Sequence, residues 1–254
     1  MSTQSNCGVL VDSSGNAGLT LNGNISMTAP TIGVVGNYLA NGNVTTNPTP
    51  KTGMIAASDP LAYVQEPSVG ACNHTNFLLN GNNGTKAAPY QMNPGVYCGG
   101  ILINGNSYVN FNAGTYILAG GGMTVNGNSY LTGSGVTFYN TTGSGGYQGI
   151  TMNGNTQANL SAPTSGALEG ILFFQDRTVP EGSAGSVING NSSSTFDGAL
   201  YFSTMQPTYN GNSSANGYTI IVADKWLING NSQMGNNYSS LADGSPIKGP
   251  TLSE

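Results

Sequence analysis

The carboxylates are the residues in this sequence that could do the most obvious chemistry, because two of them across a groove can cleave a glycosidic bond. Such a pair must stand roughly 5 to 9.5 Å apart. Asp176 and Asp197 lie about one repeat apart and are the best candidates, but the neighbouring Asp176 and Arg177 favour an exposed ion pair. We therefore expect no catalytic residue and no enzymatic activity, with a polysaccharide-acting enzyme as an alternative. The acidic residues are Asp12, Asp59, Glu66, Glu169, Asp176, Glu181, Asp197, Asp224, Asp243 and Glu254.

Other catalytic and metal-binding combinations are poorly represented. His74 is the only histidine, and no Gly-x-Ser-x-Gly motif supplies a serine nucleophile for it. A structural zinc site needs about four ligands, whereas His74 has only Cys72 close to it in sequence. Calcium-binding glycine-rich repeats carry a recurrent Asp, and the repeats of this chain carry Asn. We expect no metal and no cofactor.

Three cysteines, Cys7, Cys72 and Cys98, leave one unpaired if two of them form a disulfide. Cys72 and Cys98 bracket the loop around 86–92. A bridge there would stabilise the fold by about 3 kcal/mol. We predict this disulfide, and the alternative is three reduced thiols buried as small apolar residues.

The elements that would position these residues are organised by the tripeptide Asn-Gly-Asn, which occurs nine times. Successive copies are 19, 39, 24, 22, 27, 36, 21 and 19 residues apart. Apolar residues alternate before most copies, which is typical of a strand with one buried face, and Asn-Gly then favours a corner. The paired Asn residues are Asn22 and Asn24, Asn41 and Asn43, Asn80 and Asn82, Asn104 and Asn106, Asn126 and Asn128, Asn153 and Asn155, Asn189 and Asn191, Asn210 and Asn212, and Asn229 and Asn231.

These spacings distinguish two architectures. A series of hairpins would place a turn roughly every 8 to 12 residues, whereas a coil of a three-sided solenoid needs about 20. We therefore predict an all-β, right-handed parallel β-helix (β-solenoid) of about ten coils of roughly 19–24 residues, with Asn-Gly-Asn at the corners. Stacked in register, the corner Asn side chains would form ladders that satisfy their polar groups.

Composition limits the partners. The chain has 254 residues, of which 37% are hydrophobic and only 6% charged, with a net charge of −5. Five scattered basic residues argue against nucleic-acid binding. No apolar run reaches the roughly 18 residues of a membrane helix, and residues 1–6 do not resemble a signal peptide, so we expect no membrane segment in this chain.

We expect residues 1–254 to form a single β-helix domain. Four prolines interrupt 44–71, which we predict to be an excursion from the stack, together with 178–185. Residues 241–254 read as a tail. Outward-facing threonines, namely Thr20, Thr124, Thr137, Thr151 and Thr219, would face solvent on the strands.

Several short motifs carry a resemblance to a known family. They are Tyr97-Cys98-Gly99-Gly100, Gly135-Val136-Thr137-Phe138-Tyr139, Phe174-Gln175-Asp176-Arg177, Gly198-Ala199-Leu200-Tyr201-Phe202, Val222-Ala223-Asp224 and Gly244-Ser245-Pro246-Ile247-Lys248, with Asp59-Pro60-Leu61 upstream. Together they resemble the C-terminal region of bacterial TadG-like proteins, which are associated with Flp (tight-adherence) pilus assembly. The resemblance implies an extracytoplasmic β-helical domain, normally tethered by an N-terminal membrane segment. It transfers no catalytic residue, and the family's additional N-terminal cysteine, a partner for Cys7, is missing here.

We therefore expect a non-enzymatic, secreted or cell-surface bacterial module with a structural or adhesive role. Its partners would be a glycan or proteins of the envelope or pilus. A surface-binding β-solenoid that recognises glycan or ice is the alternative. The ends of such a stack present unpaired strand edges, so we expect the N-terminal segment or the tail to cover one end, or the molecules to associate end to end.

Overall fold

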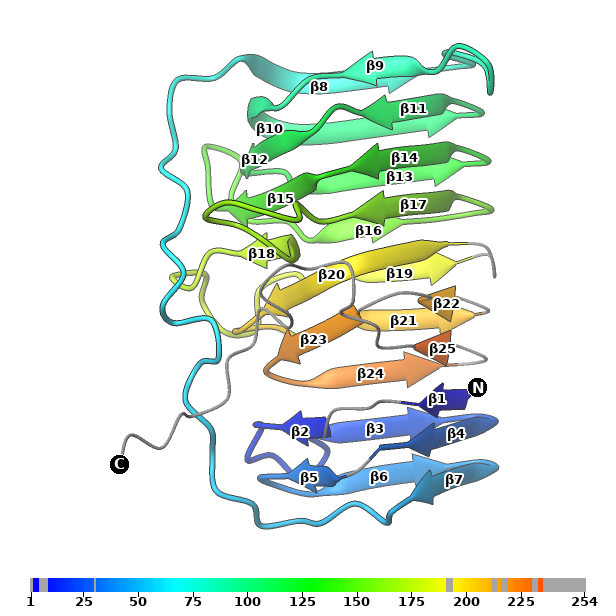
Figure 1. Cartoon of the computed structure of the whole chain (residues 1–254), viewed down its shortest axis with the longest axis vertical. Coiled ribbons are helices and arrows are strands. Elements are labelled where there is room, and N and C mark those ends of the chain that lie inside the picture. Colours follow the sequence, from blue (N-terminus) through cyan, green and yellow to red (C-terminus); the bar gives the residue numbers. More distant parts are fainter. Residues whose placement is uncertain are drawn as a thin grey trace.

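The computed structural model describes residues 2–4, 9–29, 31–190, 194–211, 214–215, 219–229 and 233–234. Within these residues every regular element is a strand and there is no helix, so none of them forms a helix that could cross a membrane. All strand pairings are parallel, and the strands stack as successive coils of a β-solenoid (Figure 1). The predicted parallel β-helix is confirmed.

One side of the solenoid, which we call the Asn sheet, ends at the Asn-Gly-Asn corners. It contains nine strands, close to the predicted ten coils, and its last strand residues include the first Asn of each tripeptide or directly precede it. Its strands are β8 (His74–Asn80), the second half of β10 (Gly95–Gly105), β13 (Met123–Gly127), β16 (Ile150–Met152), β19 (Val187–Gly190), β21 (Thr208–Gly211), β24 (Trp226–Asn229), β3 (Leu19–Asn22) and β6 (Tyr38–Asn41). At the corners glycine provides left-handed backbone angles, as at Gly105 with φ of 105°.

The second side, the groove sheet, follows the corner. It has two segments. The first contains β9 (Tyr90–Met92), β11 (Tyr108–Phe111), β14 (Tyr130–Ser134), β17 (Gln157–Ser161) and the start of β20 (Thr195–Phe202). The second contains β22 (Ser214–Ala215), β25 (Gln233–Met234), β1 (Ser2–Gln4), β4 (Ile25–Thr28) and β7 (Val44–Asn47).

The third side, the strap sheet, closes each coil. It contains the first half of β10, β12 (Gly114–Ala119), β15 (Val136–Thr141), β18 (Ile171–Gln175), the end of β20 and β23 (Thr219–Ala223), and in the N-terminal coils β2 (Val9–Val11) and β5 (Ile32–Val34).

The coils do not stack in chain order. Strand β24, near the C-terminal end of the described chain, pairs with β3, placing Asn229 beside Asn22. The chain therefore starts inside the stack and descends to β7. It then runs along the outside to β8 at the opposite end, from which it winds back to β24 (Figure 1).

The outer segment is residues 48–73, which we call the strap. The predicted excursion at 44–71 was too early at its start, because 44–47 form β7 and pair with β4. Residues 178–185 lie outside the strands, as predicted, although Val179 is buried. The predicted tail, 241–254, lies outside the described residues.

The interior is filled by inward rows of aliphatic and aromatic side chains, one residue per coil. Stacked rings of Tyr97, Tyr116 and Phe138 run along one such row, with centroid separations of 6.0 and 5.2 Å. The core of the N-terminal coils incorporates Trp226, so the junction between β24 and β3 is part of a packed core.

The strap sheet is buried on both faces at β15, β18 and the end of β20. Its outward row includes Tyr139, Phe174 and Tyr201, and the strap covers this row with Leu61 and Val64. This explains the continuous apolar run at 171–174, because Leu172 and Phe173 pack into the core whereas Ile171 and Phe174 belong to the cluster that contains the strap residues.

Candidate binding site

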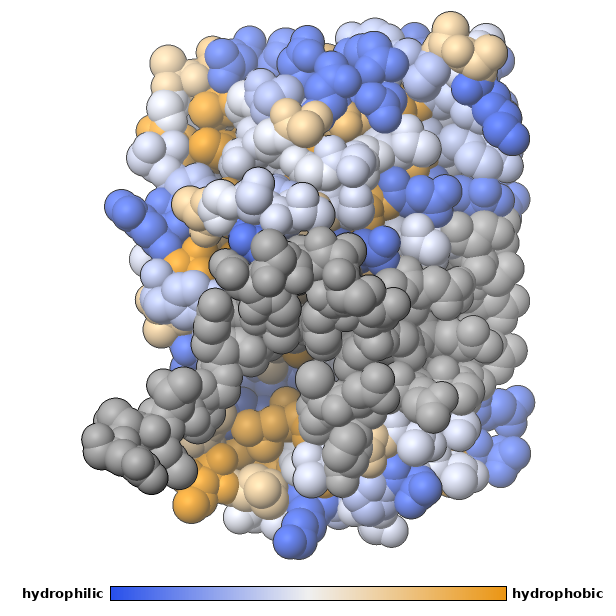
Figure 2. Space-filling view, in the orientation of Figure 1, coloured by the Kyte–Doolittle hydropathy of each residue, from blue (hydrophilic) through white to orange (hydrophobic). Residues whose placement is uncertain are grey.

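The groove sheet carries rows of polar side chains on its outer face, because every second residue of its strands points away from the core. Strand pairing places Gln91, Asn110, Thr132, Asn159 and Thr195 in one row across five strands. In Figure 2 the surface over β9, β11 and β14 is mainly pale to hydrophilic. This sheet therefore offers solvent an ordered array of amides and hydroxyls.

Hydrogen bonds link this row except at one position. The Asn110 amide donates to Gln91 Oε1 at 2.9 Å, and the Thr132 hydroxyl donates to Asn110 Oδ1 at 3.0 Å. Beyond the gap, the Thr195 hydroxyl donates to Asn159 Oδ1 at 3.0 Å. No hydrogen bond joins Thr132 to Asn159 among the described contacts, so the row is interrupted between β14 and β17.

A second row, two residues further along the strands, is interrupted one strand later. The Ser161 hydroxyl donates to Ser134 Oγ at 3.2 Å. Asp197 is the next member in register. Its Oδ1 is buried and has no hydrogen-bond partner within the described structure, and burial raises the pKa of this carboxyl above its ordinary value.

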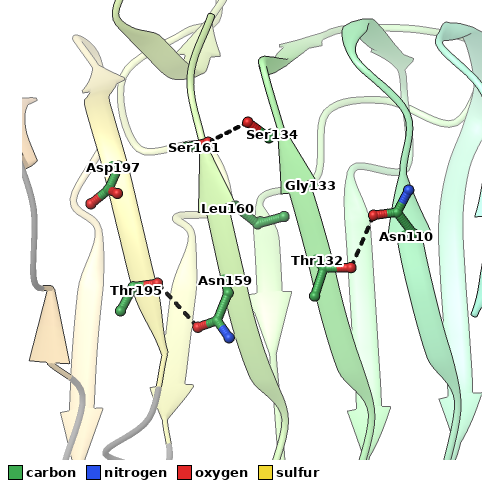
Figure 3. Close-up of a pocket in the computed structure, with 9 residues that line it drawn as sticks. All are labelled: Asn110, Thr132, Gly133, Ser134, Asn159, Leu160, Ser161, Thr195 and Asp197. Carbon is green, nitrogen blue, oxygen red and sulfur yellow. Dashed lines mark hydrogen bonds between the residues drawn. The ribbon is translucent and has the colours of Figure 1, made fainter. Parts of the chain in front are cut away.

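These two interruptions meet in one groove of about 330 Å³ over β14, β17 and β20. Figure 3 shows the side chains around it, with Leu160 lying toward Gly133 between the two polar rows. Both Gly133 and Leu160 are buried. The lining residues are Asn110, Thr132, Gly133, Ser134, Asn159, Leu160, Ser161, Thr195 and Asp197.

The groove suits a neutral ligand that has many hydroxyl groups. Its lining contains amides, hydroxyls and one carboxylate, and none of the lining residues is basic. The Asp197 carboxylate can accept hydrogen bonds from hydroxyls, whereas it would repel an anion. The volume falls at the lower end of the range of small-ligand sites.

Two tyrosines flank the polar rows on the same sheet. Tyr108 and Tyr130 are paired in register, and their rings stack at 4.9 Å with an interplanar angle of 6°. Tyr130 is 38% exposed. The pair adds an exposed aromatic edge with two phenol groups beside the amides and hydroxyls.

The Asn corners form the ladder that their repetition suggested. Seven Asn side-chain amides each donate to the Oδ1 of the Asn one coil away, at 2.7–3.1 Å, and all seven bonds run in one direction. The ladder joins Asn104, Asn126, Asn153, Asn189, Asn210, Asn229, Asn22 and Asn41, in that order. Asn80 lies in register beside Asn104.

The second Asn of the tripeptides forms a shorter ladder. The Asn128 amide donates to Asn106 Oδ1 at 2.9 Å, and the Asn155 amide donates to Asn128 Oδ1 at 3.0 Å. Asn24, Asn43 and Asn82 lie at the other described corners, whereas Asn191, Asn212 and Asn231 lie outside the described residues.

The Asn sheet carries one further outward row, parallel to its ladder. Its nine members are five aliphatic residues and four threonines, in the order Leu78, Leu102, Thr124, Thr151, Val187, Thr208, Leu227, Thr20 and Leu39. Of the threonines expected to face outward, Thr20, Thr124 and Thr151 lie in this row. Thr137 was predicted wrongly, because it is buried and its hydroxyl donates to the Ile171 carbonyl. The side chain of Thr219 lies outside the described residues.

A cluster of charged and aromatic side chains around Arg177 holds the strap on the solenoid. The Arg177 guanidinium contacts Asp59 at 2.8 Å and Glu66 at 3.3 Å, and it stands over the rings of Phe174 and Tyr201 at 5.0 and 5.3 Å. Burial alone would raise the pKa of Asp59, but hydrogen bonds from Arg177 and Tyr201 outweigh it and lower the pKa. The ion pair expected between Asp176 and Arg177 is therefore wrong, because Arg177 turns toward the strap.

The two carboxylates considered for glycoside cleavage do not come together. Asp176 follows the end of β18 and accepts hydrogen bonds from Thr141 and Thr178, whereas Asp197 precedes Ala199, which pairs with Ile171 at the start of β18. Asp197 pairs with Ser161 on the groove sheet, whereas Asp176 lies just past the strap-sheet strand β18, so the two carboxylates belong to different sides of the solenoid. The groove that Asp197 lines does not include Asp176, whereas two cooperating carboxylates must face one another across one groove.

The remaining candidates lie at the β8 end of the stack. A disulfide joins Cys72 to Cys98, with the Cα atoms 5.6 Å apart. It attaches the end of the strap to β10 and leaves Cys72 without a thiolate for a metal. His74 stacks on Tyr97 at 4.6 Å. The described residues contain no cluster of three or more metal-ligating side chains, and Cys7 lies outside them.

No family model, curated protein or solved structure matches this chain. The sequence pattern identified the Asn corners because they recur. It missed the groove, since Asn110, Thr132 and Asn159 occur singly and become a row only through strand register. The alternation of apolar and polar residues around these positions was the one sequence signal that could have placed them on the outer face of a strand.

Proposed function

We propose that this chain is a non-enzymatic, extracytoplasmic adhesive module that binds a neutral glycan in the groove over β14, β17 and β20. The observation that carries the proposal is the Oδ1 of Asp197, which is buried and has no hydrogen-bond partner among the described residues, beside interrupted rows of amides and hydroxyls. A glycan hydroxyl would supply the missing donor.

The scaffold supports this assignment. The groove residues are held on adjacent strands, so their positions are fixed before a ligand arrives and little ordering is needed on binding. The resemblance to TadG-like proteins fits a bacterial cell-surface setting, and it makes proteins of the envelope or the Flp pilus reasonable partners. In that setting the module would attach a larger assembly to a carbohydrate surface.

The test is binding of the purified chain to an array of bacterial and host glycans, followed by titration of each glycan that responds. We expect saturable binding that Asp197→Asn weakens at least tenfold and Asn159→Ala weakens by a smaller factor. Glu181→Gln is the matched control, because it removes one negative charge from an exposed position outside the groove. Equal weakening by Glu181→Gln, or release of cleaved sugar, would contradict the proposal.

A second candidate function is supported by the Asn sheet. Nine in-register residues bearing methyl groups run beside the Asn ladder, with neighbouring strands about 4.8 Å apart and the two rows about 6.7 Å apart. Such a flat lattice could match a repeating surface, including ice.

The lattice candidate has its own test. If it is correct, the wild-type chain slows or reshapes ice crystal growth and the double variant Thr124→Lys, Thr151→Lys does not. The groove variant Asp197→Asn would then remain active on ice. Ice growth unaffected by the wild-type chain would eliminate this candidate.

A further inference from the structure

Each end of the solenoid has strands that are paired on one side only, and the strands at the two ends belong to the same two sheets. Strand β6 pairs only with β3, and β8 pairs only with β10, among the pairings of the described residues. In the groove sheet, β7 and β9 are likewise paired on one side only. All these strands run in parallel, so the β6 end of one molecule and the β8 end of another can continue the same sheets.

The rows of the Asn sheet are also complementary across the two ends. The ladder bonds all point from Asn41 toward Asn104, which leaves Asn41 Oδ1 as an acceptor at one end and places the Asn80 amide at the other. Leu39 and Leu78 are the terminal members of the aliphatic row and are 47% and 56% exposed. A second molecule would place Asn80 beside Asn41 and Leu78 beside Leu39.

The interior rows continue in the same way. Tyr38 and Phe77 are the end members of one inward row, and both are only partly buried. Ala40 is exposed at the end of the neighbouring row. The end strands β6, β7, β8 and β9 contain no Asp, Glu, Lys or Arg, so no like charges oppose their approach.

The molecule already contains one contact of this kind. Strands β24 and β3 belong to coils 207 residues apart at their Asn ladder bond, and no turn connects them. They nevertheless pair in register, bury Trp226 and continue the ladder. Coil ends of this chain therefore dock in register without a turn that connects them directly.

We infer that the chain associates head to tail with further copies of itself, β6 and β7 of one molecule pairing with β8 and β9 of the next. The contact joins different surfaces on the two partners, so it does not close and generates filaments. Nine coils at about 4.8 Å give an axial repeat of about 43 Å. This inference does not depend on glycan binding.

Sedimentation velocity over a range of protein concentrations tests the inference. The wild-type chain should form species larger than the 25.8 kDa monomer, with mass rising with concentration. Ala40→Lys places a charge at the end of the core and should block the β6 end. Leu78→Pro should block the β8 end, because proline cannot donate to a ladder.

Mixing the two variants gives the decisive result. Each variant alone should remain a monomer, and an equimolar mixture should form a species of twice the monomer mass and nothing larger. Ala167→Lys is the matched control, because it makes the same substitution at an exposed position in the loop between β17 and β18, away from both end strands, and should leave assembly intact.

A second mixing experiment tests the inference without the variant Leu78→Pro. Ala40→Lys added to wild-type chain should shorten the assemblies, since each variant molecule ends a filament. Wild-type chain that stays monomeric at every concentration would overturn the inference, as would Ala40→Lys assembling as fully as wild type.

Discussion

Arg177 is the residue that holds the strap against the solenoid, through Asp59, Glu66 and two aromatic rings. Its side chain is 25% exposed, so its ion pairs are partly shielded from water. We expect Arg177→Met to lower the free energy of unfolding by about 2 kcal/mol, between the values for exposed and fully buried pairs. Urea unfolding at neutral pH measures this loss, with Lys225→Met as the exposed control.

The same cluster predicts a pH dependence. The pKa of Asp59 is lowered in the folded chain, so its contribution to stability is present above the ordinary value near 3.8 and is lost as pH falls through the folded pKa. Asp59→Asn should therefore lower stability at pH 6 and flatten the loss of stability below pH 4. If the stability of Asp59→Asn fell as steeply below pH 4 as that of the wild-type chain, this role of Asp59 would be contradicted.

The pH dependence of stability that Asp197 contributes is opposite in sign to that of Asp59. Burial raises its pKa, so ionisation disfavours the folded state and stability falls as pH rises through the folded pKa. We expect Asp197→Asn to raise stability at pH 7 by about 0.5–1 kcal/mol while glycan binding becomes at least tenfold weaker. Thermal unfolding at pH 7 provides the measurement, and a destabilised variant would show that Asp197 serves the fold.

Among individual residues, the sequence predicted the roles of those that recur in every coil. Asn126 and its counterparts were found because the tripeptide recurs at coil spacing. The contact between Asp59 and Arg177 could not be derived, because it joins residues 118 apart and depends on the course of the strap. Asp197 was singled out for a carboxylate pair with Asp176, which strand register rules out.

The contribution of a ladder Asn to the free energy of unfolding depends on whether the residue lies inside the ladder or at its end. An interior member such as Asn126 makes two ladder bonds, whereas Asn41 makes one. We expect Asn126→Ala to cost about 2 kcal/mol and Asn41→Ala about half as much, because each net hydrogen bond contributes about 1 kcal/mol. Chemical denaturation of both variants measures the difference, and equal costs would show that the ladder does not act bond by bond.

Alternation predicted the strands of the Asn sheet well, since apolar residues at every second position point into one core. It failed at 44–47, where Val44 and polar neighbours form β7 at an exposed end of the stack. Prolines directly after this strand led to a predicted excursion that begins four residues too early. The strand at 171–175 is buried on both faces, and its cover by the strap was not predictable, because Leu61 and Val64 are more than 100 residues away in sequence.

The order of the coils is a property of the whole molecule. The N-terminal coils are joined to the rest by strand pairing with β24 and β25 and by the strap. Ile55 is 90% exposed, so a protease site introduced there would be accessible. We expect the two fragments to remain associated after cleavage, because β3 and β24 share a packed core.

Size-exclusion chromatography after cleavage tests this topology. Co-elution of both fragments in buffer, and separation only in denaturant, is the expected result. Separation in buffer would mean that the strap, rather than strand pairing, holds the N-terminal coils. The sequence could not predict this order, because a regular repeat is compatible with any order of stacking.

The most direct test of the proposed function is a titration of the wild-type chain and Asp197→Asn with the strongest ligand from a glycan array, with Glu181→Gln in parallel. The proposal predicts saturable binding by wild type and Glu181→Gln, and binding at least tenfold weaker by Asp197→Asn. Undiminished binding by Asp197→Asn, or no glycan bound by the wild-type chain, would contradict it.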